Sequence, residues 1–295
     1  MSGLLFIEAN GPVMSTISTT LCFIGAGNMA KSLIGGLIAS GYPKEHIIAT
    51  DPTADQRELI TQTFGIVCLA DNNAAIERAD TVILSVKPQI LQSVCKSIQS
   101  AVQSKNPLVI SVAAGIRTGD IDRWLGGNQA IVRTMPNTPS LIQTGATGLY
   151  ANARVSAEQK EQTEQIMRAA GLAIWVEKEQ QLDAVTALSG SGPAYYFLFM
   201  EAMEDAAQQL GLDAKTAHLL TLQTALGAAK MASESNETCA TLRKNVTSPN
   251  GTTEQAINTF EAEGLRDMVA NAMQAAHHRA TELGDELANE IGDDA

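Results

Sequence analysis

A glycine-rich stretch near the start of the chain has the residue types that the phosphates of a dinucleotide require. Its pattern is GxGxxG with alanine in the third place, and it consists of Gly25, Ala26, Gly27, Asn28, Met29 and Ala30. The first glycine permits a tight turn, the second lets the backbone approach a pyrophosphate, and the alanine allows close packing of helix on strand. An apolar run precedes the stretch and a helical pattern follows it, so unpaired N–H groups and the positive end of a helix dipole would face the phosphates. Glycine turns often serve packing alone, but this order of strand, turn and helix predicts a dinucleotide site.

Three loops later in the chain each follow an apolar run. They are Ser85, Val86, Lys87 and Pro88; Ala113 and Ala114 with the glycine after them; and the stretch MPNTP at residues 135–139. In folds that alternate strands with helices, ligands bind beyond the carboxyl ends of the strands. Small residues and prolines at that edge let the backbone approach a cofactor. The small residues and prolines of a single loop could serve only to turn the chain, whereas three such loops in succession indicate a cofactor site.

Asp51 ends another short apolar run and bears on the choice of cofactor. An acid at this place binds a ribose 2′-hydroxyl and repels a 2′-phosphate, which favours NADH. Thr50, Thr53 and Arg57 offer groups that could instead bind a 2′-phosphate. Asp51 also precedes Pro52, and its carboxylate could serve only to stabilise that turn. The residues alone leave these interpretations open.

Two polar loops in the second half of the chain lead into helical patterns. One is SGSGP at residues 189–193, and the other is TSPNGTT at residues 247–253. Hydroxyl groups and unpaired amides at the start of a helix can bind an anion. Ser and Thr also cap helices routinely, and for either loop taken alone a cap is the simpler interpretation.

The elements that must position these residues divide the chain in two. Short apolar runs alternate with helical patterns up to about residue 175, which predicts βαβ units around a parallel sheet. From residue 182 onward no stretch has a strand pattern, and we expect helices over residues 193–210, 213–233, 240–246, 253–261 and 266–288. The predicted fold is α/β, with a Rossmann-type doubly wound parallel sheet in residues 1–178 and an all-helical domain in residues 179–295. Several late helices are rich in alanine on more than one face, which favours burial against a second subunit.

Composition and charge restrict the partners and the compartment. The 295 residues are 45% apolar and carry a formal net charge of −12, so nucleic acid and anionic membranes are poor partners. No apolar run is long enough to span a membrane, and residues 1–13 lack the basic start of a signal peptide. We interpret them as a disordered tail or as sequence upstream of the true start at Met14, and we expect a cytoplasmic protein. The four cysteines lie far apart without a CxxC pair, which predicts small buried side chains and no metal site.

Taken together, these motifs resemble those of the pyrroline-5-carboxylate reductase family. The resemblance extends from FIGAGNMA at residues 23–30 through SVKPQ, SVAAG, VRTMPNTP, AVTALSGSGPAY and NVTSPNGTTEQAI to the last helix. It implies a Rossmann domain followed by a helical dimerisation domain that intertwines with a partner subunit, as a homodimer or a ring of dimers. The implied reaction is NAD(P)H-dependent reduction of 1-pyrroline-5-carboxylate to L-proline, with NADPH preferred over NADH.

The resemblance also assigns roles to residues at matching positions. The implied cofactor contacts are residues 25–30, 85–88, 113 and 114, and the position of Asp51 at the end of the second strand adds it as a further cofactor residue. The implied substrate loop comprises Asn245, Gly251, Thr252 and Thr253. Thr253 is the implied catalytic side chain, because the match puts its hydroxyl beside the imine nitrogen. There are two departures from the family pattern: Asn250 stands where glycine is common, and Asp51 is an acid that argues against NADPH.

The sequence leaves other functions open. A β-hydroxyacid dehydrogenase has the same two-part layout, but its chemistry needs a general acid–base, usually a lysine on the long central helix. Residues 192–211 contain no lysine and offer Tyr195 and Tyr196 instead. This favours an imine substrate, either 1-pyrroline-5-carboxylate or a related cyclic imine, because a protonated C=N is already electrophilic. A non-catalytic dinucleotide sensor is a further hypothesis, and the polar residues of the 247–253 loop argue against it.

Overall fold

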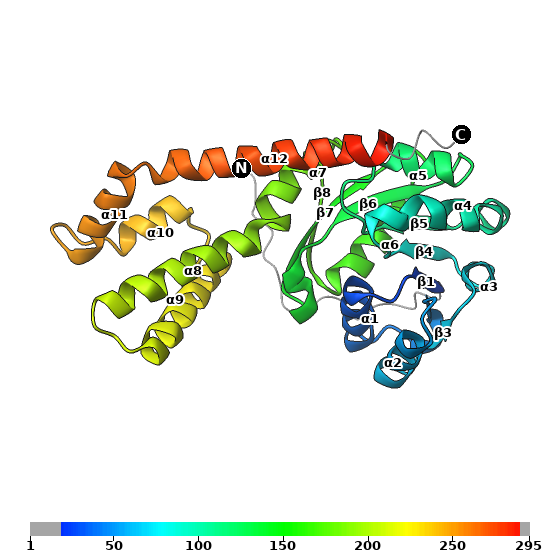
Figure 1. The fold of residues 1–295 in the computed structure, drawn as a ribbon, viewed down its shortest axis with the longest axis horizontal. Coiled ribbons are helices and arrows are strands. Elements are labelled where there is room, and N and C mark those ends of the chain that lie inside the picture. The colour runs from blue at the N-terminus through cyan, green and yellow to red at the C-terminus, as the bar shows by residue number, and fades with distance from the viewer. Residues whose placement is uncertain (1–18, 290–295) are drawn as a thin grey trace. The chain divides into compact units, whose positions relative to one another are not determined.

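The computed structural model describes residues 19–289, which form two compact units (Figure 1). One, here called the sheet unit, contains the described residues up to Pro193 together with residues 275–289. The other, the helical unit, contains residues 194–274. The tail predicted at residues 1–13 lies outside the described residues.

The sheet unit is built on eight strands in the order β3-β2-β1-β4-β5-β6-β7-β8. The strands are β1 Leu21–Ile24, β2 Ile47–Thr50, β3 Val67–Leu69, β4 Thr81–Leu84, β5 Leu108–Ser111, β6 Ile131–Met135, β7 Gly145–Ala151 and β8 Gly171–Trp175. Strands β1 to β6 run parallel, and their order is that of the Rossmann fold. Every residue of β1, β2, β4 and β5 is buried, as expected for a parallel sheet covered on both faces. The predicted Rossmann-type α/β fold is confirmed.

Strands β7 and β8 extend the sheet beyond its parallel part. β7 runs antiparallel to β6, and β8 runs parallel to β7. The sequence of β7, GATGLYA, is interrupted by glycine and does not predict a strand. One of these glycines, Gly148, has a packing reason: a β-carbon there would lie 2.8 Å from Val185 Cγ1 and 3.0 Å from Leu182 Cδ2. The glycine therefore lets the helix α7 (Gln181–Val185) pack onto the sheet.

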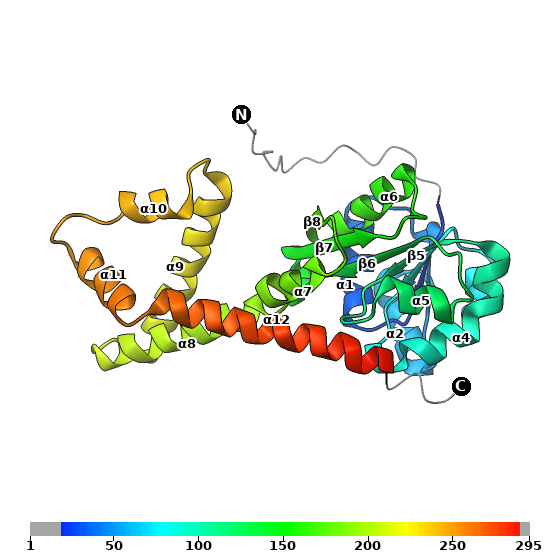
Figure 2. The ribbon, with the colours of Figure 1, turned by 90° about the horizontal axis from the view of Figure 1, so that it is seen from above.

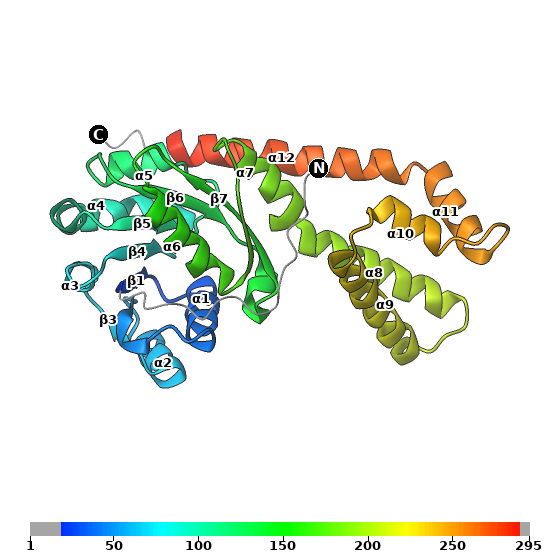
Figure 3. The ribbon, with the colours of Figure 1, turned by 180° about the vertical axis from the view of Figure 1, so that it is seen from behind.

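Six helices cover the two faces of the sheet. They are α1 Asn28–Ala39, α2 Ala54–Phe64, α3 Asn72–Ile76, α4 Pro88–Lys105, α5 Thr118–Trp124 and α6 Ala157–Arg168. Helices α1, α2 and α6 share a core with Phe23 and Ile83, whereas α3, α4 and α5 share one with Cys22 and Val82. Successive residues of a strand point to opposite faces, so each strand supplies both cores. Figure 3 shows these helices around the strands.

Two segments beyond residue 178 pack on the sheet unit. One is α7 with the π-helical turn η3 (Thr186–Gly190), next to β7. The other is the second half of α12 (Leu265–Asn289), where a side chain at Gly115 would come within 3.2 Å of Leu287 Cδ1. The contacts of this chain therefore group these segments with the sheet. The domain division that the sequence predicts between residues 178 and 179 stays a prediction.

The helical unit has almost no core of its own. Its helices are α8 (Gly192–Gln209) from residue 194 on, α9 (Ala214–Glu234), α10 (Cys239–Asn245), α11 (Thr252–Ala262) and the first part of α12 (Figure 2). They agree with the predicted ranges to within one residue at each end. Among residues 194–274 only Ala217 and Thr221 are buried. Its exposed apolar side chains include Tyr196, Phe197, Leu198, Leu210, Leu219, Leu220, Leu226, Met231 and Met268. No helix within residues 19–289 is long and apolar enough to cross a membrane.

The side chains capable of metal or redox chemistry are scattered. Within the described part of the chain, no three His, Cys, Asp or Glu residues gather as a metal site would require. Cys22 and Cys95 are buried as predicted, and burial raises the pKa of each thiol to about 12. Cys239 is exposed at the start of α10, so the prediction of burial is wrong there. Its neighbours in the helical unit do not form a core that could cover it.

Candidate active site

The turn after β1 admits only glycine at its first position. Gly25 has a φ of +94°, and a β-carbon there would lie 2.8 Å from Val86 Cγ1 and 2.9 Å from the Ser85 carbonyl oxygen. The Gly25 amide donates to the Thr50 carbonyl at 3.0 Å, and Ser85 Oγ donates to the Gly25 carbonyl at 2.9 Å. The glycine-rich stretch and the loop after β4 therefore lie against each other at the carboxyl edge of the parallel strands.

Gly27 faces open space at the start of α1. Apart from atoms of its two chain neighbours, no heavy atom would lie within 4 Å of a β-carbon at this position. The residue is also exposed. Its φ of −72° and ψ of −170° are available to any residue, so the backbone conformation does not require glycine. The amides of Asn28, Met29 and Ala30 lie in the first turn of α1, where the helix offers them no carbonyl. The open space, the unpaired amides and the helix dipole fit a pyrophosphate.

Asp51 joins two turns at the end of β2. Its Oδ1 accepts a hydrogen bond from the Thr53 amide at 2.9 Å, and its Oδ2 accepts one from the Ala26 amide at 3.3 Å. The Arg57 guanidinium donates to the carbonyls of Asp51 and Pro52, each at 2.8 Å. The carboxylate therefore stabilises the turn that it begins and also braces the glycine-rich stretch.

The structure excludes Thr50 from the residues that could bind a 2′-phosphate. It is 0% exposed, and its Oγ1 donates to the Phe23 carbonyl at 3.4 Å inside the sheet. Thr53 is exposed and Arg57 is half-buried at the same strand end. The sequence could not distinguish Thr50 from Thr53 and Arg57 as a phosphate ligand. It does not show which way a side chain at the last position of a strand, here Thr50, points.

The other two cofactor loops leave the same edge of the sheet. Lys87 is the exposed N-cap of α4, and Pro88 is its first residue, so this helix begins close to the end of β4. After β5, Ala113 is buried and donates from its amide to Ser111 Oγ at 3.3 Å, whereas Ala114 is exposed. Because β1, β4 and β5 run parallel, the predicted cofactor residues lie together at one edge.

The predicted substrate residues flank the turn between α10 and α11 in the helical unit (Figure 2). Asn245 ends α10, and its Nδ2 donates to Glu237 Oε2 at 2.9 Å. Gly251 is the N-cap of α11, and the exposed Thr252 and Thr253 are its first two residues. Their amides have no carbonyl within the helix. The Thr253 hydroxyl makes no hydrogen bond to any group within residues 19–289, so it does not cap α11.

The backbone explains why asparagine replaces glycine at position 250. Asn250 has a φ of +59°, a left-handed conformation that asparagine tolerates better than most residues other than glycine. Its amide donates to Glu254 Oε2 at 2.7 Å, which closes the turn onto the start of α11. This departure from the family pattern therefore keeps the shape of the loop.

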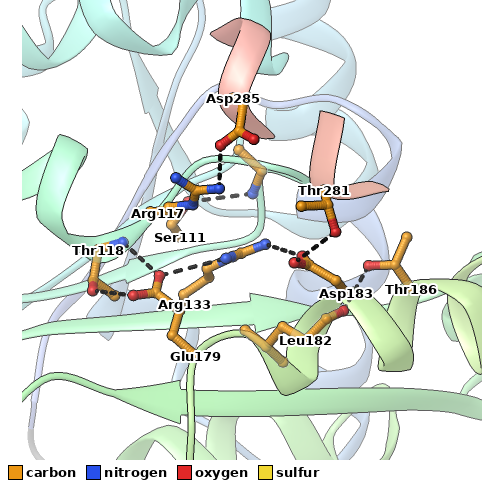
Figure 4. Close-up of polar contacts among 11 residues, drawn as sticks. Ser111, Arg117, Thr118, Arg133, Glu179, Leu182, Asp183, Thr186, Thr281 and Asp285 are labelled. Carbon is orange, nitrogen blue, oxygen red and sulfur yellow. Dashed lines mark hydrogen bonds and ion pairs between the residues drawn. The ribbon is translucent and has the colours of Figure 1, made fainter. Parts of the chain in front are cut away.

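The sequence analysis missed a buried ion network centred on Arg133 in β6 (Figure 4). The Arg133 side chain is 5% exposed, with Nη1 3.4 Å from Glu179 Oε1 and Nη2 3.5 Å from Asp183 Oδ1. Glu179 also accepts a hydrogen bond from the Thr118 amide at 2.7 Å, and Thr281 Oγ1 of α12 donates to Asp183 Oδ2 at 3.5 Å. The one available signal was a charged residue inside the apolar run IVRTM.

A second ion pair holds the end of α12 in the same region (Figure 4). Arg117 Nη2 lies 2.5 Å from Asp285 Oδ1, and this hydrogen bond raises the pKa of Arg117. Both side chains are about half exposed, so water screens the pair and it contributes little to stability. Its effect is to place the last turns of α12 beside the loop that follows β5.

Two family models match separate parts of the chain. Residues 20–115 match the model described as NADP oxidoreductase coenzyme F420-dependent. Residues 179–283 match the model described as Pyrroline-5-carboxylate reductase dimerisation. The first match contains the glycine-rich stretch and the loops after β4 and β5, and the second contains the turn between α10 and α11.

Single proteins match over nearly the whole length. A pyrroline-5-carboxylate reductase of Pseudomonas aeruginosa is 53% identical over 267 residues, which are 90% of this chain and 97% of that protein. The structure of a pyrroline-5-carboxylate reductase from Coxiella burnetii has a TM-score of 0.88 and 48% identity, and the match covers 90% of this chain and 98% of that one. The pyrroline carboxylate reductase of Plasmodium falciparum, solved with NADP bound, has a TM-score of 0.79 and 29% identity over the same shares.

We expect Gly27→Val to weaken dinucleotide binding while leaving the fold intact. The added side chain would fill the space through which the backbone approaches the phosphates, so the Kd for NADPH should rise at least about tenfold, or ~1.4 kcal/mol. Gly27 is the N-cap of α1, where valine is less favourable than glycine, so the melting temperature should fall only slightly, as for a loss of about 1 kcal/mol or less. Gly25→Val is the contrast, because the positive φ and the close contacts there should lower the melting temperature much more. Calorimetric titration and thermal unfolding measure both quantities, and normal NADPH affinity in Gly27→Val would remove the phosphate role from this stretch.

Proposed function

This chain belongs to the pyrroline-5-carboxylate reductase family, and we propose that it reduces 1-pyrroline-5-carboxylate to L-proline with a hydride from NAD(P)H. In this proposal the reaction is the last step of proline biosynthesis and takes place in the cytoplasm. The observation that carries it is the start of α11, where the exposed Thr253 hydroxyl stands beside unpaired amides. These groups suit a small carboxylate that also bears a basic nitrogen.

The sheet unit would supply the dinucleotide site. The amides of residues 28–30 would bind the pyrophosphate, for which Gly27 leaves room. Residues 85–88, 113 and 114, with the loop after β6, would line the nicotinamide end of the site. NAD(P)H supplies the hydride when bound, and the residues of this chain orient the reactants and exclude water.

The helical unit would supply the substrate site. The amides of Thr252 and Thr253 would hold the substrate carboxylate, because the Gly251 amide already donates to the Ser248 carbonyl at 3.0 Å. Asn245 lies at the other end of the turn. The Thr253 hydroxyl would hold the ring nitrogen, because a hydroxyl can donate to the nitrogen or accept from it as its protonation changes. A threonine is too weak an acid to protonate an imine at neutral pH. The proton would therefore arrive from water or with a substrate that is already protonated.

Helix α8 bears on the alternative of a β-hydroxyacid dehydrogenase. It contains no lysine, and its Tyr195 and Tyr196 are exposed in the single chain. Reduction of a ketone requires a proton donor positioned at the oxygen, whereas a protonated imine does not. The lack of a lysine on α8 therefore supports the imine substrate.

The proposal is tested by following the oxidation of NADPH and NADH, at equal concentrations, with 1-pyrroline-5-carboxylate. We expect oxidation that depends on the imine and yields proline in equal amount. A parallel assay offers a β-hydroxyacid with NADP⁺ and NAD⁺ and should give no reduction of the dinucleotide. Turnover of the hydroxyacid alone would support the dehydrogenase, and tight dinucleotide binding without turnover of either substrate would support a sensor.

The same chain is proposed to assemble through its helical unit, as a homodimer or as a ring of dimers. A match to a dimerisation model supports this, as does the near absence of buried residues between 194 and 274. Single chains rarely leave so many large apolar side chains in water. In this proposal the second copy covers them and contributes to the active site.

Replacing Leu222 and Leu226 of α9 together by glutamate should dissociate the assembly. The two residues lie one helical turn apart and are exposed in the single chain. The change would cost little in a monomer, but it would bury two unpaired carboxylates in an interface. Light scattering should then give the mass of one chain, whereas the parent and the control Leu59→Glu on α2 should keep at least twice that mass. A parent protein that is active and uniformly monomeric at low concentration contradicts the proposal.

Thr253→Val should reduce kcat/KM for the imine by about 10- to 1000-fold, in line with the loss of one positioned hydrogen bond. Valine keeps the shape and removes the hydroxyl, and NADPH affinity should be unchanged because the phosphate site lies in the other unit. Thr259→Val, on the same helix, is the matched control, since that hydroxyl bonds only to the Gln255 carbonyl. Near-normal kcat/KM in Thr253→Val would show that the hydroxyl has no catalytic role.

We propose that both dinucleotides are used and that NADPH is preferred, with Thr53 and Arg57 at the 2′-phosphate. Asp51→Ser should then raise the ratio of kcat/KM for NADPH to that for NADH by about fivefold, because two charges about 4 Å apart in water repel by ~1 kcal/mol. Serine can still accept the Thr53 amide and keep the turn. Asp55→Ser, at an exposed position in the first turn of α2, is the control. An unchanged ratio would leave Asp51 with its structural role alone.

A further inference from the structure

The side chain of Asn137 joins three parts of the sheet unit just beyond β6. The ladder between β6 and β7 ends with Met135 opposite Gly148, and Pro136 follows without an N–H to continue it. Asn137 Oδ1 takes the place of a ladder carbonyl and accepts from the Ala146 amide at 2.9 Å. Its Nδ2 donates to the Ser189 carbonyl at 3.0 Å. One amide therefore ties the loop after β6 both to β7 and to the π-helical turn η3.

The backbone hydrogen bond of the turn η3 spans five residues, one more than in an α-helix, and two hydroxyl groups donate to carbonyls one turn earlier. The Ser191 amide donates to the Thr186 carbonyl at 2.8 Å, across five residues. Thr186 Oγ1 donates to the Leu182 carbonyl at 2.8 Å, and Ser189 Oγ donates to the Val185 carbonyl at 3.0 Å. Widened turns of this kind occur frequently at functional sites.

Two further contacts show that the loop after β6 is fixed along its length. A β-carbon at Gly190 would come within 2.6 Å of Met135 Cε, so the turn packs directly on the end of β6. On the other side, Ser32 Oγ of α1 donates to the carbonyl of Ser140, which is buried. The loop is therefore held between η3 and the helix that begins at the glycine-rich stretch.

We propose that Asn137 is a positioning residue for hydride transfer, which it serves by fixing the backbone at Pro136 and Asn137 along the nicotinamide edge. The inference rests on the proposed function. Strand β6 is parallel to β5, so this loop leaves the sheet at the same edge as the predicted cofactor residues. The amide group is required for the two contacts, because it must donate to one carbonyl and accept from one amide. Aspartate has the same shape but cannot donate, and its charge would face the Ser189 carbonyl.

Asn152 offers a matched control at the opposite end of β6. Its Nδ2 donates to the Gln129 carbonyl at 3.0 Å, and its Oδ1 accepts from the Ile131 amide at 3.3 Å. It thus makes the same pair of backbone contacts as Asn137, beside the first residue of the strand, and its Oδ1 also accepts from the Arg154 amide at 3.1 Å. Substitutions at Asn152 should therefore cost at least as much stability as those at Asn137 and differ in their effect on the reaction.

The experiment compares Asn137→Ala and Asn137→Asp with the same changes at Asn152. At saturating substrates, the Asn137 variants should lose about 10- to 100-fold in kcat, since small displacements at the reacting centre have effects of that size. Their deuterium isotope effect on kcat, measured with NADPH carrying two deuterons at C4, should exceed that of the parent because hydride transfer becomes slower than the other steps. The Kd for NADPH should change by less than about twofold, since the pyrophosphate contacts are intact. In the protein without cofactor, hydrogen exchange of the Ala146 amide should accelerate only in Asn137→Ala, because the aspartate oxygen still accepts from that amide.

The outcomes separate this inference from the proposed function. If the parent turns over the imine, and the Asn137 variants keep the parent's isotope effect and kcat while losing only melting temperature, as the Asn152 variants do, then Asn137 is structural and the inference is wrong. If the parent does not turn over the imine at all, the proposed function itself is wrong, and the inference falls with it. Asn137→Asp keeps the volume of the parent residue and the hydrogen bond from the Ala146 amide, so it isolates the loss of the Ser189 contact.

Discussion

Arg133 carries a positive charge into the interior of the sheet unit, and the neighbouring segments are arranged around that charge. Removing a charged group from water costs several kcal/mol, which only well-placed opposite charges and hydrogen bonds offset. Glu179 and Asp183 supply the charges, so the chain after β8 must return across the end of β6. Asp183 also accepts a hydrogen bond from Thr281, which holds the returning half of α12 at the same place. The segments that lead into and out of the helical unit are therefore both anchored on one buried cation.

Two polar anchors on β6 and its loop act on one continuous segment. Arg133 holds the start of α7 through Asp183, and Asn137 holds η3 through the Ser189 carbonyl. Between these anchors the chain departs from α-helical geometry, and the hydroxyls of Thr186 and Ser189 donate to the carbonyls of Leu182 and Val185. The irregular turn is thus stable because it is fixed at both ends to the strand whose loop borders the cofactor edge.

The sequence predicted those parts of the fold whose cause is local. The roles of Gly25 and Gly27 could be predicted because a tight turn and an approachable backbone require glycine. The late helices could be predicted because caps and glycines mark their ends. Strand β7 could not, since the glycine that interrupts its pattern makes room for a helix more than thirty residues later. The role of Asn137 was hidden for the same reason: its partner Ser189 lies 52 residues away. Thr50 and Asp51 show the limit at a single position, because only the structure shows which of two adjacent side chains points into the sheet.

The net charge of −12 poses a problem for a chain whose proposed substrate and cofactor are both anions. Basic side chains solve it only in part: Arg57 uses its Nη1 on two carbonyls and keeps Nε and Nη2 for a 2′-phosphate, whereas Arg133 is neutralised by two carboxylates. Both candidate sites instead begin helices, α1 after Gly27 and α11 after Gly251. The unpaired amides there act only within the first turn, so they attract an anion that is already in contact and add nothing to the long-range field. Because such a site needs free backbone more than charge, its residues are mostly small or hydroxyl-bearing, as are four of the six residues of GAGNMA and the two threonines after Gly251.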